Sequence, residues 1–369
     1  MRFFFLLYTF IKKRPLMHTK ITGTGCYIPK VIQTNNDFLD HKFHNSDGSE
    51  IVGDSKIVID KFVAITGIEE RRYVEENKVT SQIAYEAAKH AIKASGIDAE
   101  TLDYIIVAHN YGDIKHGTIQ SDTVPSLASR VKHLLKIENP YCVAYDMMFG
   151  CPGWIESIIQ AHAFIKSSMA KKCLVIGAET LSRVVDPHDR DSMIYSDGAG
   201  ACIVEASEED DKGIIAHKSA SFTYDEVKYL FFGGTYDSES PSKTQYIKMY
   251  GRKIYNFALT HVPDAMKACL DESGYNIQDI KKILIHQANE KMDEAIVERF
   301  YKLYNQEMPK DVMPMTIHKL GNSSVATVPT LLDMILNDKV EGHQINEGDV
   351  VIFASVGAGM NINAIVYKF

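Results

Sequence analysis

The sequence of 369 residues predicts an α/β protein built from two related halves. The first reason is a set of continuous apolar runs, including residues 104–108 and 350–353, which are typical of strands covered on both faces. The second is that stretches with apolar residues at helical spacing lie between these runs. The third is that the order of elements in the first half returns in the second, and such an internal repeat helps to define a fold.

The first half is predicted to extend over residues 17–211. Its clearest helix begins at the capping pair Thr80-Ser81 and ends at Ser95-Gly96. The stretch through Asp54 is polar and is expected to be rich in loops. Strands are expected at residues 20–28, 104–108, 173–176 and 198–204, and helices at residues 80–95, at residues 125–135 and after Cys151.

The acidic run from Glu205 to Asp211 is the predicted boundary, and residues 212–369 form the second half. Both halves contain a helix, a Ser-Gly pair, a short link, a buried strand and a histidine, which is His109 in the first half and His286 in the second. The elements expected in the second half are strands at residues 213–219, 283–285 and 350–353, a polar hairpin or loop around residues 236–244, a helix at residues 252–273 and a helix ending at residue 336.

Composition narrows the possible classes of protein. Hydrophobic residues make up 45% of the chain and charged residues 24%, which is ordinary for a soluble enzyme. A formal net charge of −8 argues against nucleic-acid binding, because that function normally requires a basic surface. An acidic carrier protein can still dock on a local basic patch.

The cysteines favour a reducing compartment. Six cysteines are present, without a Cys-x-x-Cys pair or a paired histidine motif. This pattern argues against a structural zinc site and against a disulfide framework. A cytoplasmic protein without a metal site is therefore expected.

The first sixteen residues do not resemble a membrane span. Residues 3–11 are apolar and precede Lys12-Lys13-Arg14-Pro15, but nine residues are too few to cross a bilayer, and no small-residue cleavage site follows. We interpret residues 1–16 as an N-terminal extension or as the product of a misassigned start, with Met17 as the true first residue. A weak signal anchor is the less favoured alternative.

Cys151 is the strongest candidate for a nucleophile. It lies in Gly150-Cys151-Pro152-Gly153, ahead of a helical pattern, and proline suits the first position of a helix. The amino end of a helix favours an anion, so we expect a lowered thiol pKa. A packed core cysteine is the alternative for this residue alone. The buried face of the helix is expected to contain Trp154, Ile158, Ala161, Phe164 and Ile165.

The internal repeat connects Cys151 to two further residues. Cys151 and Asn322 occupy equivalent helix starts in the two halves, so a pseudo-twofold axis would bring them into one cleft. His286 follows a buried strand, and Asn322 lies in a turn that caps the next helix. Alone, each is more often structural. Together they supply a nucleophile and two hydrogen-bond donors.

Seven short motifs in one order carry a resemblance to a known family. They are Thr22-Gly23-Thr24-Gly25, Thr66-Gly67-Ile68-Glu69-Glu70-Arg71, Gly150-Cys151-Pro152-Gly153-Trp154, Ser196-Asp197-Gly198-Ala199-Gly200-Ala201, His286-Gln287-Ala288-Asn289, Gly321-Asn322-Ser323-Ser324 and Gly357-Ala358-Gly359. Across residues 17–369 the chain resembles the β-ketoacyl-acyl-carrier-protein synthase III family of the thiolase-like superfamily. The resemblance implies a layered αβαβα fold and a homodimer.

The resemblance also implies a Cys-His-Asn triad. Cys151 would take an acyl group from a thioester, with the backbone N–H groups of Cys151 and Ala358 as the oxyanion hole. His286 and Asn322 would donate to the thioester oxygen of malonyl-acyl-carrier protein as CO₂ leaves. The product would be a β-ketoacyl-carrier protein, in fatty-acid initiation or in a specialised lipid or polyketide pathway. Coenzyme A or phosphopantetheine thioesters would be substrates, and no metal or redox cofactor is implied.

Three further residues are predicted to bind substrate or carrier. Lys291 matches a basic position that contacts the carrier in the family, although a solvated helix lysine is an equal alternative. Arg190 matches a basic contact to coenzyme A, and Gln287 lies in the histidine motif.

The chain also departs from the family. Lys61 and Ile65 stand where well-studied members have an aromatic residue and an arginine that clamp the adenine of coenzyme A. This predicts a weaker coenzyme A site and leaves a carrier protein as the alternative acyl donor. The stretch at residues 36–62 is longer than usual.

Two other functions stay open. One is a thiolase-like acyltransferase that does not decarboxylate malonyl groups. The other is a catalytically silent subunit of a heterodimeric synthase, which the intact Cys151, His286 and Asn322 disfavour. An α/β-hydrolase is less favoured still, because the chain has no Gly-x-Ser-x-Gly elbow.

Overall fold

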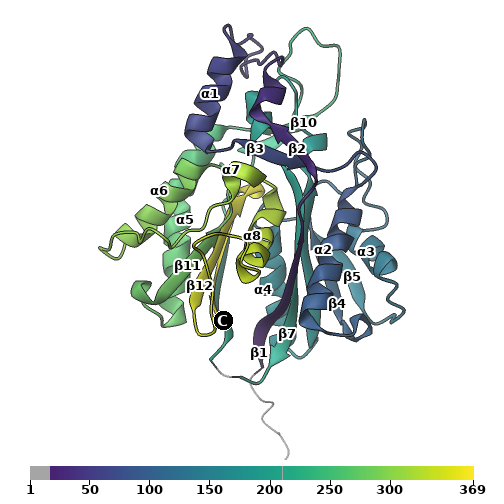
Figure 1. Cartoon of the computed structure of the whole chain (residues 1–369), viewed down its shortest axis with the longest axis vertical. Coiled ribbons are helices and arrows are strands. Elements are labelled where there is room, and N and C mark those ends of the chain that lie inside the picture. Colours follow the sequence, from purple (N-terminus) through teal and green to yellow (C-terminus); the bar gives the residue numbers. More distant parts are fainter. Residues whose placement is uncertain (1–16, 210) are drawn as a thin grey trace, which may run out of the picture.

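The computed structural model describes residues 17–209 and 211–369. Two sheets face each other in the body of the molecule, with helices between them and on both outer sides (Figure 1). Our interpretation of residues 1–16 lies outside the described residues. Within the described ranges, no helix combines the length and the apolar character that a membrane crossing requires.

The first sheet contains five strands in the order β1-β7-β6-β4-β5. The pairs β1–β7 and β6–β7 are antiparallel, whereas β4 pairs in parallel with β6 and with β5. The strands are β1 (His18–Tyr27), β4 (Tyr104–Ala108), β5 (Val143–Met147), β6 (Lys172–Thr180) and β7 (Asp197–Ser207).

The second sheet repeats this arrangement in the order β8-β13-β12-β11. The pairs β8–β13 and β12–β13 are antiparallel, and β11–β12 is parallel. Strand order and direction therefore match those of β1-β7-β6-β4, so the repeat seen in the sequence is present in both sheets. The strands are β8 (Gly213–Ser221), β11 (Ile280–Ile285), β12 (Val350–Gly357) and β13 (Asn361–Lys368). We propose residues 211 and 212 as the junction between the halves.

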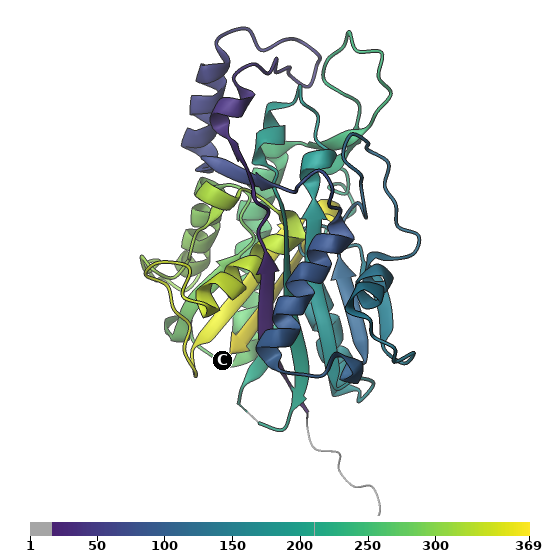
Figure 2. The same ribbon diagram turned by 45° about the vertical axis from the view of Figure 1, so that its right-hand side comes forward.

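Successive side chains of a strand point to opposite faces of the sheet, so they pack in different layers of the core. In β6, Cys173 and Val175 pack into a central apolar cluster with α4 (Gly153–Lys166) and α8 (Thr327–Leu336). Their neighbours Leu174 and Ile176 pack outward with α2 (Thr80–Ser95) and α3 (Leu127–Leu135). The opposite face of the second sheet packs against α5 (Gly251–Ser273) and α6 (Glu290–Lys302). These five layers confirm the predicted αβαβα fold (Figures 1 and 2).

The Ser-Gly pairs end helices in both halves, as their sequence predicts. Gly96 follows α2 with φ 71°, and Gly274 follows α5 with φ 78°. Both values lie in the left-handed region that glycine adopts without strain. In both halves, a glycine therefore ends the helix that precedes the next strand of the sheet, β4 or β11.

A small cap lies at one end of the body (Figures 1 and 2). It contains α1 (Ser55–Thr66), the ribbon β2 (Val31–Thr34) with β3 (Glu70–Tyr73), and the hairpin β9 (Leu230–Gly233) with β10 (Tyr246–Met249). The remaining short elements are α7 (Ile317–Leu320) and the 3₁₀ turns η1 (Asn35–Phe38), η2 (Ala99–Thr101), η3 (Leu181–Arg183), η4 (Arg190–Ile194), η5 (Ile277–Asp279), η6 (Ser324–Ala326) and η7 (Ala358–Met360).

The long stretch at residues 36–62 is an ordered part of the cap. Phe38, Phe43 and Phe62 form an apolar cluster with residues of the body. The backbone N–H of His44 donates to the carbonyl of His188 at 2.8 Å. The insertion therefore contacts the loop that leads to Arg190. α1 begins directly after the stretch through Asp54 that was predicted to be rich in loops.

A buried lysine joins the hairpin to the same loop. Lys248 of β10 is completely buried and contacts Asp186 at 2.6 Å and Asp189 at 3.1 Å. Because a buried charge without a partner costs several kcal/mol, these two carboxylates hold the hairpin against the loop.

An arginine on α6 compensates for a proline inside α5. Pro263 has no N–H, so the carbonyl of Leu259 loses its helical donor. Arg299 Nη1 donates to that carbonyl at 2.9 Å. Arg299→Met is therefore expected to lower the free energy of unfolding by about 1 kcal/mol in urea titrations. Lys302→Met, on an exposed site of the same helix, is the control, and equal effects of the two changes would contradict this role.

Candidate active site

Cys151 lies in the turn that leads into the central helix α4. The helix begins at Gly153 after Pro152, so proline stands one position earlier than predicted. The predicted apolar face is confirmed, because Trp154 and the residues that follow it at helical spacing pack in the central cluster. The sulfur is thereby placed between the two sheets, at the amino end of a buried helix.

The thiol of Cys151 is not acidic in the resting site. Burial raises its pKa to about 11, and the nearby carboxyl of Glu179 acts in the same direction. A hydrogen bond from Ser324 acts against both and lowers the pKa. The prediction of a lowered pKa is therefore wrong, because desolvation outweighs the favourable helix end. At neutral pH the residue is a thiol that loses its proton during attack.

Ser324 brings the three predicted residues together. Its hydroxyl donates to Cys151 Sγ at 3.3 Å, and its backbone N–H donates to Asn322 Oδ1 at 2.8 Å. His286 forms a hydrogen bond with the backbone of the same serine. Side chains from three distant segments therefore meet at one residue. The sequence motif contained Ser324, but spacing alone assigned it no role.

The two donors are buried and are held by backbone bonds. His286 follows β11, and its N–H donates to the carbonyl of Ala354 at 2.9 Å. The N–H of Asn322 donates to Ile194, and its carbonyl accepts from Ser196 at 2.8 Å. Burial lowers the pKa of His286 to about 4, so the imidazole is neutral at neutral pH. Two neutral groups with fixed backbones thus interact with the serine whose hydroxyl donates to the thiol.

Close backbone packing places the two expected oxyanion donors on touching segments. A Cβ added to Gly357 would lie 2.6 Å from the backbone nitrogen of Cys151. A Cβ added to Gly150 would lie 2.6 Å from the backbone nitrogen of Ala358. Both positions therefore require glycine, and the segments 150–151 and 357–358 lie backbone against backbone.

Comparison with known proteins identifies the family. Residues 145–221 match the family model 3-Oxoacyl-[acyl-carrier-protein (ACP)] synthase III, and residues 270–369 match the model of its C-terminal part. A protein of Neisseria meningitidis serogroup B named "Beta-ketoacyl-[acyl-carrier-protein] synthase III" is 34% identical over 96% of this chain and 100% of its own length. The chain belongs to the β-ketoacyl-acyl-carrier-protein synthase III family.

Further members of the synthase III family agree with this assignment. "Beta-ketoacyl-[acyl-carrier-protein] synthase III 1" of Vibrio vulnificus is 32% identical over 96% of this chain and 100% of its own length. The crystal structure of 3-oxoacyl-[acyl-carrier-protein] synthase III from Aquifex aeolicus superposes with a TM-score of 0.77 at 30% identity, covering 95% of this chain and all of that one. The fold is therefore thiolase-like.

The structure contradicts one of the three predicted ligand-binding residues of this synthase III family member. Gln287 is fully buried, its Nε2 donates to the carbonyl of Pro314 at 2.8 Å, and its Oε1 accepts from the N–H of Thr316 at 2.9 Å. Both ends of the amide are used inside the chain. Gln287 therefore holds the segment 314–316 and cannot reach a substrate or a carrier.

The other two predicted binding residues are exposed. Arg190 begins η4 beside the cap, with its side chain 60% exposed. Lys291 lies exposed in the first turn of α6, after the histidine motif. Both remain available to a ligand, and neither contacts Cys151 in the resting site.

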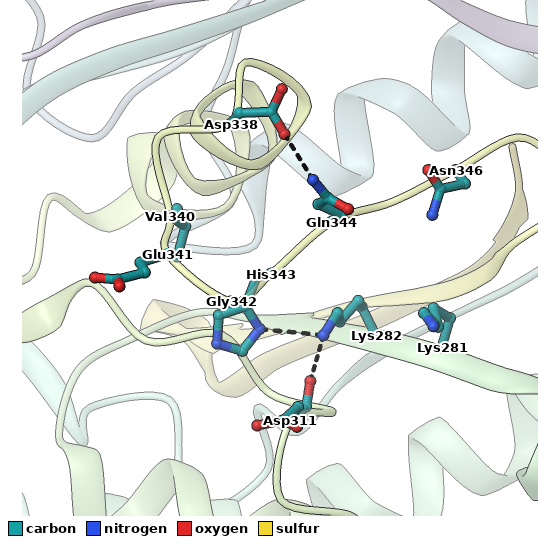
Figure 3. A pocket seen from close by; sticks show the side chains of 10 residues that line it. All are labelled: Lys281, Lys282, Asp311, Asp338, Val340, Glu341, Gly342, His343, Gln344 and Asn346. Carbon is teal, nitrogen blue, oxygen red and sulfur yellow. Dashed lines mark hydrogen bonds between the residues drawn. The ribbon is translucent and has the colours of Figure 1, made fainter.

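A polar pocket is lined by residues near the start of β11 (Figure 3). It has a volume of about 520 Å³ and is lined by Lys281, Lys282, Asp311 and the loop at residues 338–346. Lys281 and Lys282 are near the start of β11, whereas His286 follows its end. The pocket is therefore separate from the candidate active site. Among the described residues, no group of three histidine, cysteine or acidic side chains is arranged to hold a metal ion.

Proposed function

We propose that this synthase III family member condenses an acyl thioester with malonyl-acyl-carrier protein and releases CO₂. The supporting observation is the meeting of Cys151, His286 and Asn322 at Ser324, at the start of the central helix. This arrangement supplies a nucleophile and two neutral donors in a buried site. The product is a β-ketoacyl-carrier protein for fatty-acid initiation or for a specialised lipid or polyketide pathway.

Acylation uses the cysteine. The sulfur of Cys151 forms a bond to the carbonyl carbon of the donor, and the bond from that carbon to the donor sulfur breaks. The thiol proton leaves with the departing thiol. Backbone N–H groups of Cys151 and Ala358 stabilise the charge on the carbonyl oxygen, a contribution of about 3 kcal/mol per donor in comparable sites.

Condensation uses the two neutral donors. The bond between the malonyl carbon and its carboxylate breaks, CO₂ leaves, and the electron pair forms an enolate. His286 and Asn322 donate hydrogen bonds to the enolate oxygen. The enolate carbon then bonds to the acyl carbon on Cys151, and the bond to sulfur breaks. Because CO₂ leaves its electrons behind, no base is needed to remove a proton from carbon.

Labelled malonyl-carrier protein separates this function from its alternatives. The proposal requires one CO₂ released for each β-ketoacyl product and an acyl group on Cys151 by mass spectrometry. A ketoester product without CO₂ release would instead indicate a non-decarboxylating acyltransferase. A protein that never acquires an acyl group on Cys151 from any thioester would indicate a silent partner subunit.

We propose a carrier-bound acyl donor in preference to coenzyme A. Lys61 and Ile65 are exposed one turn apart on α1, so this face lacks an aromatic ring for the adenine. A panel of coenzyme A and carrier thioesters of roughly two to twelve carbons tests the donor and the chain length. The double variant Lys61→Trp, Ile65→Arg should lower KM for acyl-coenzyme A but leave KM for the carrier thioester unchanged.

Lys291 is the proposed contact for the carrier protein. Its exposed ammonium group beside the histidine motif suits the phosphate of a phosphopantetheine-serine. Lys291→Glu should raise KM for malonyl-carrier protein with little change in kcat, whereas Lys302→Glu on the same helix is the control. Equal effects of the two changes would argue against a specific contact.

We propose a homodimer that pairs through β5. This strand is an edge of the first sheet, and exposed edges tend to pair with another strand. Large apolar side chains are exposed on and around it, namely Val124, Tyr141, Val143 and Met148. Val143→Lys should produce a monomer in sedimentation experiments, while Val52→Lys in the cap should not.

The proposed compartment is the cytoplasm. All six cysteines are free thiols. A chain with this number of unpaired thiols suits a reducing environment. Fractionation of the source cells tests the location.

The low pKa of His286 predicts that the rate of CO₂ release changes little as the pH falls below neutral. A histidine with its pKa lowered to about 4 protonates only in strong acid, so it stays a neutral donor above about pH 5. CO₂ release by the Cys151→Ala variant should change less than about threefold between about pH 5.5 and 7.5. A loss of about tenfold with a midpoint near 6.5, absent in His286→Gln, would show that the imidazole titrates normally.

A further inference from the structure

We propose that Asn110 and Glu179 are positioning residues that direct the Ser324 hydroxyl toward the Cys151 sulfur. The inference rests on the proposed function of Cys151 as the nucleophile. It begins from a continuous chain of hydrogen bonds that joins β4, β6 and the turn after Asn322 at the sulfur. Glu179, Asn110 and Ser324 all lie outside the Cys-His-Asn set itself.

The chain starts at a carboxylate. Glu179 Oε2 accepts from the backbone N–H of Asn110 at 2.9 Å and from its Nδ2 at 2.6 Å. Asn110 Nδ2 also donates to Ser324 Oγ at 3.2 Å, and Ser324 Oγ donates to Cys151 Sγ at 3.3 Å. Asn110 therefore donates in both directions, to Glu179 and to Ser324, and Ser324 donates onward to the sulfur.

The carboxylate decides the direction of every hydrogen bond. Because the ionised carboxylate of Glu179 can only accept, the side-chain nitrogen of Asn110 must face Glu179 and Ser324, and the amide oxygen must face away. The serine oxygen then accepts from Asn110, so its own proton points to the sulfur. Without Asn110 the hydroxyl could rotate and accept elsewhere.

Glu179 is completely buried. Among the residues that the structure describes, its Oε1 has no hydrogen-bond partner and no lysine or arginine forms a salt bridge with it. Burial raises its pKa to about 7, His109 lowers it, and Asp197 raises it. The pKa of the Cys151 thiol depends on the same groups. The charge of Glu179 raises it, whereas the hydrogen bond from the Ser324 hydroxyl lowers it. His286, Tyr111 and Tyr195 are further titratable groups around the sulfur and Ser324.

These opposite influences give a test that a merely structural role would not satisfy. Alkylation of Cys151 by iodoacetamide at about pH 8 follows the thiolate fraction, and peptide mass spectrometry separates it from the other cysteines. Ser324→Ala and Asn110→Leu should each slow alkylation by about three- to tenfold. Glu179→Gln should accelerate it by a similar factor, because the amide still accepts from Asn110 but carries no charge.

Matched variants keep the test decisive. Ser323→Ala removes a hydroxyl from the same turn, one that faces Thr327 and not the sulfur, and should leave the alkylation rate unchanged. Asn110→Asp, which cannot donate to Ser324, should slow alkylation as Asn110→Leu does. Slowing by Ser324→Ala alone, or a change in the same direction for Glu179→Gln and Asn110→Leu, would overturn the proposal. If these shifts occur but no thioester acylates Cys151, the proposed function fails and the positioning network stands.

Discussion

Cys151→Ala is expected to lower β-ketoacyl product formation by roughly 10⁴-fold or more, equivalent to about 5 kcal/mol in transition-state stabilisation. The variant has no sulfur to carry the acyl group, so condensation has no electrophile. The two donors that stabilise the enolate, His286 and Asn322, are unchanged. CO₂ should therefore still be released from malonyl-carrier protein, but without a ketoester product.

Two measurements establish this uncoupling. Mass spectrometry of the intact protein should show no acyl adduct, and trapping of labelled CO₂ should show continued decarboxylation. Cys26→Ala removes a thiol outside the site and is the matched control. Product formation within about tenfold of the parent by Cys151→Ala would remove the basis for a covalent acyl intermediate.

Asn322→Asp is expected to lower condensation by roughly 10²- to 10³-fold, while acylation of Cys151 changes by less than about tenfold. The aspartate keeps an oxygen that can accept from the N–H of Ser324, as Asn322 Oδ1 does at 2.8 Å. It lacks the amide donor and places a carboxylate where the enolate develops. Charge repulsion then opposes the step in which CO₂ leaves.

Separate assays of the two half-reactions locate the effect. Acylation is followed by mass spectrometry with the acyl donor alone, and condensation is followed after the protein has been acylated. Asn346→Asp makes the same chemical change on an exposed loop and should alter neither rate. An equal loss in both half-reactions of Asn322→Asp would mean that the substitution damages the site as a whole and does not act on the enolate.

The sequence predicted the α/β class of the body because its signals are local. The apolar runs in β4 and β12 need no partner to be recognised, since residues covered on both faces are apolar at every position. Gly96 and Gly274 mark helix ends through backbone conformation alone. The insertion at residues 36–62 was harder to predict, because its helix α1 is stabilised by aromatic contacts with the body that sequence spacing does not reveal.

The residues of the candidate site also differ in how far the sequence could predict them. Cys151, His286 and Asn322 could be proposed from the sequence because each follows a recognisable strand or precedes a helix, and the repeat relates Cys151 to Asn322. Gln287 was assigned wrongly, since only the tertiary structure shows that both ends of its amide are used by the segment 314–316. Motif membership says that a position matters and does not say which atoms it faces.

By itself, the sequence determined the α/β class and the two related halves, because these follow from short-range pattern, and it selected the side chains that are proposed to react. The order of the layers was implied by the family resemblance. The tertiary structure alone decided that the Cys151 thiol is a weak acid and that a serine hydroxyl faces it. Desolvation and hydrogen-bond direction depend on groups such as Asn110 and Glu179, which are far away along the chain and meet the sulfur only when the sheets close around α4.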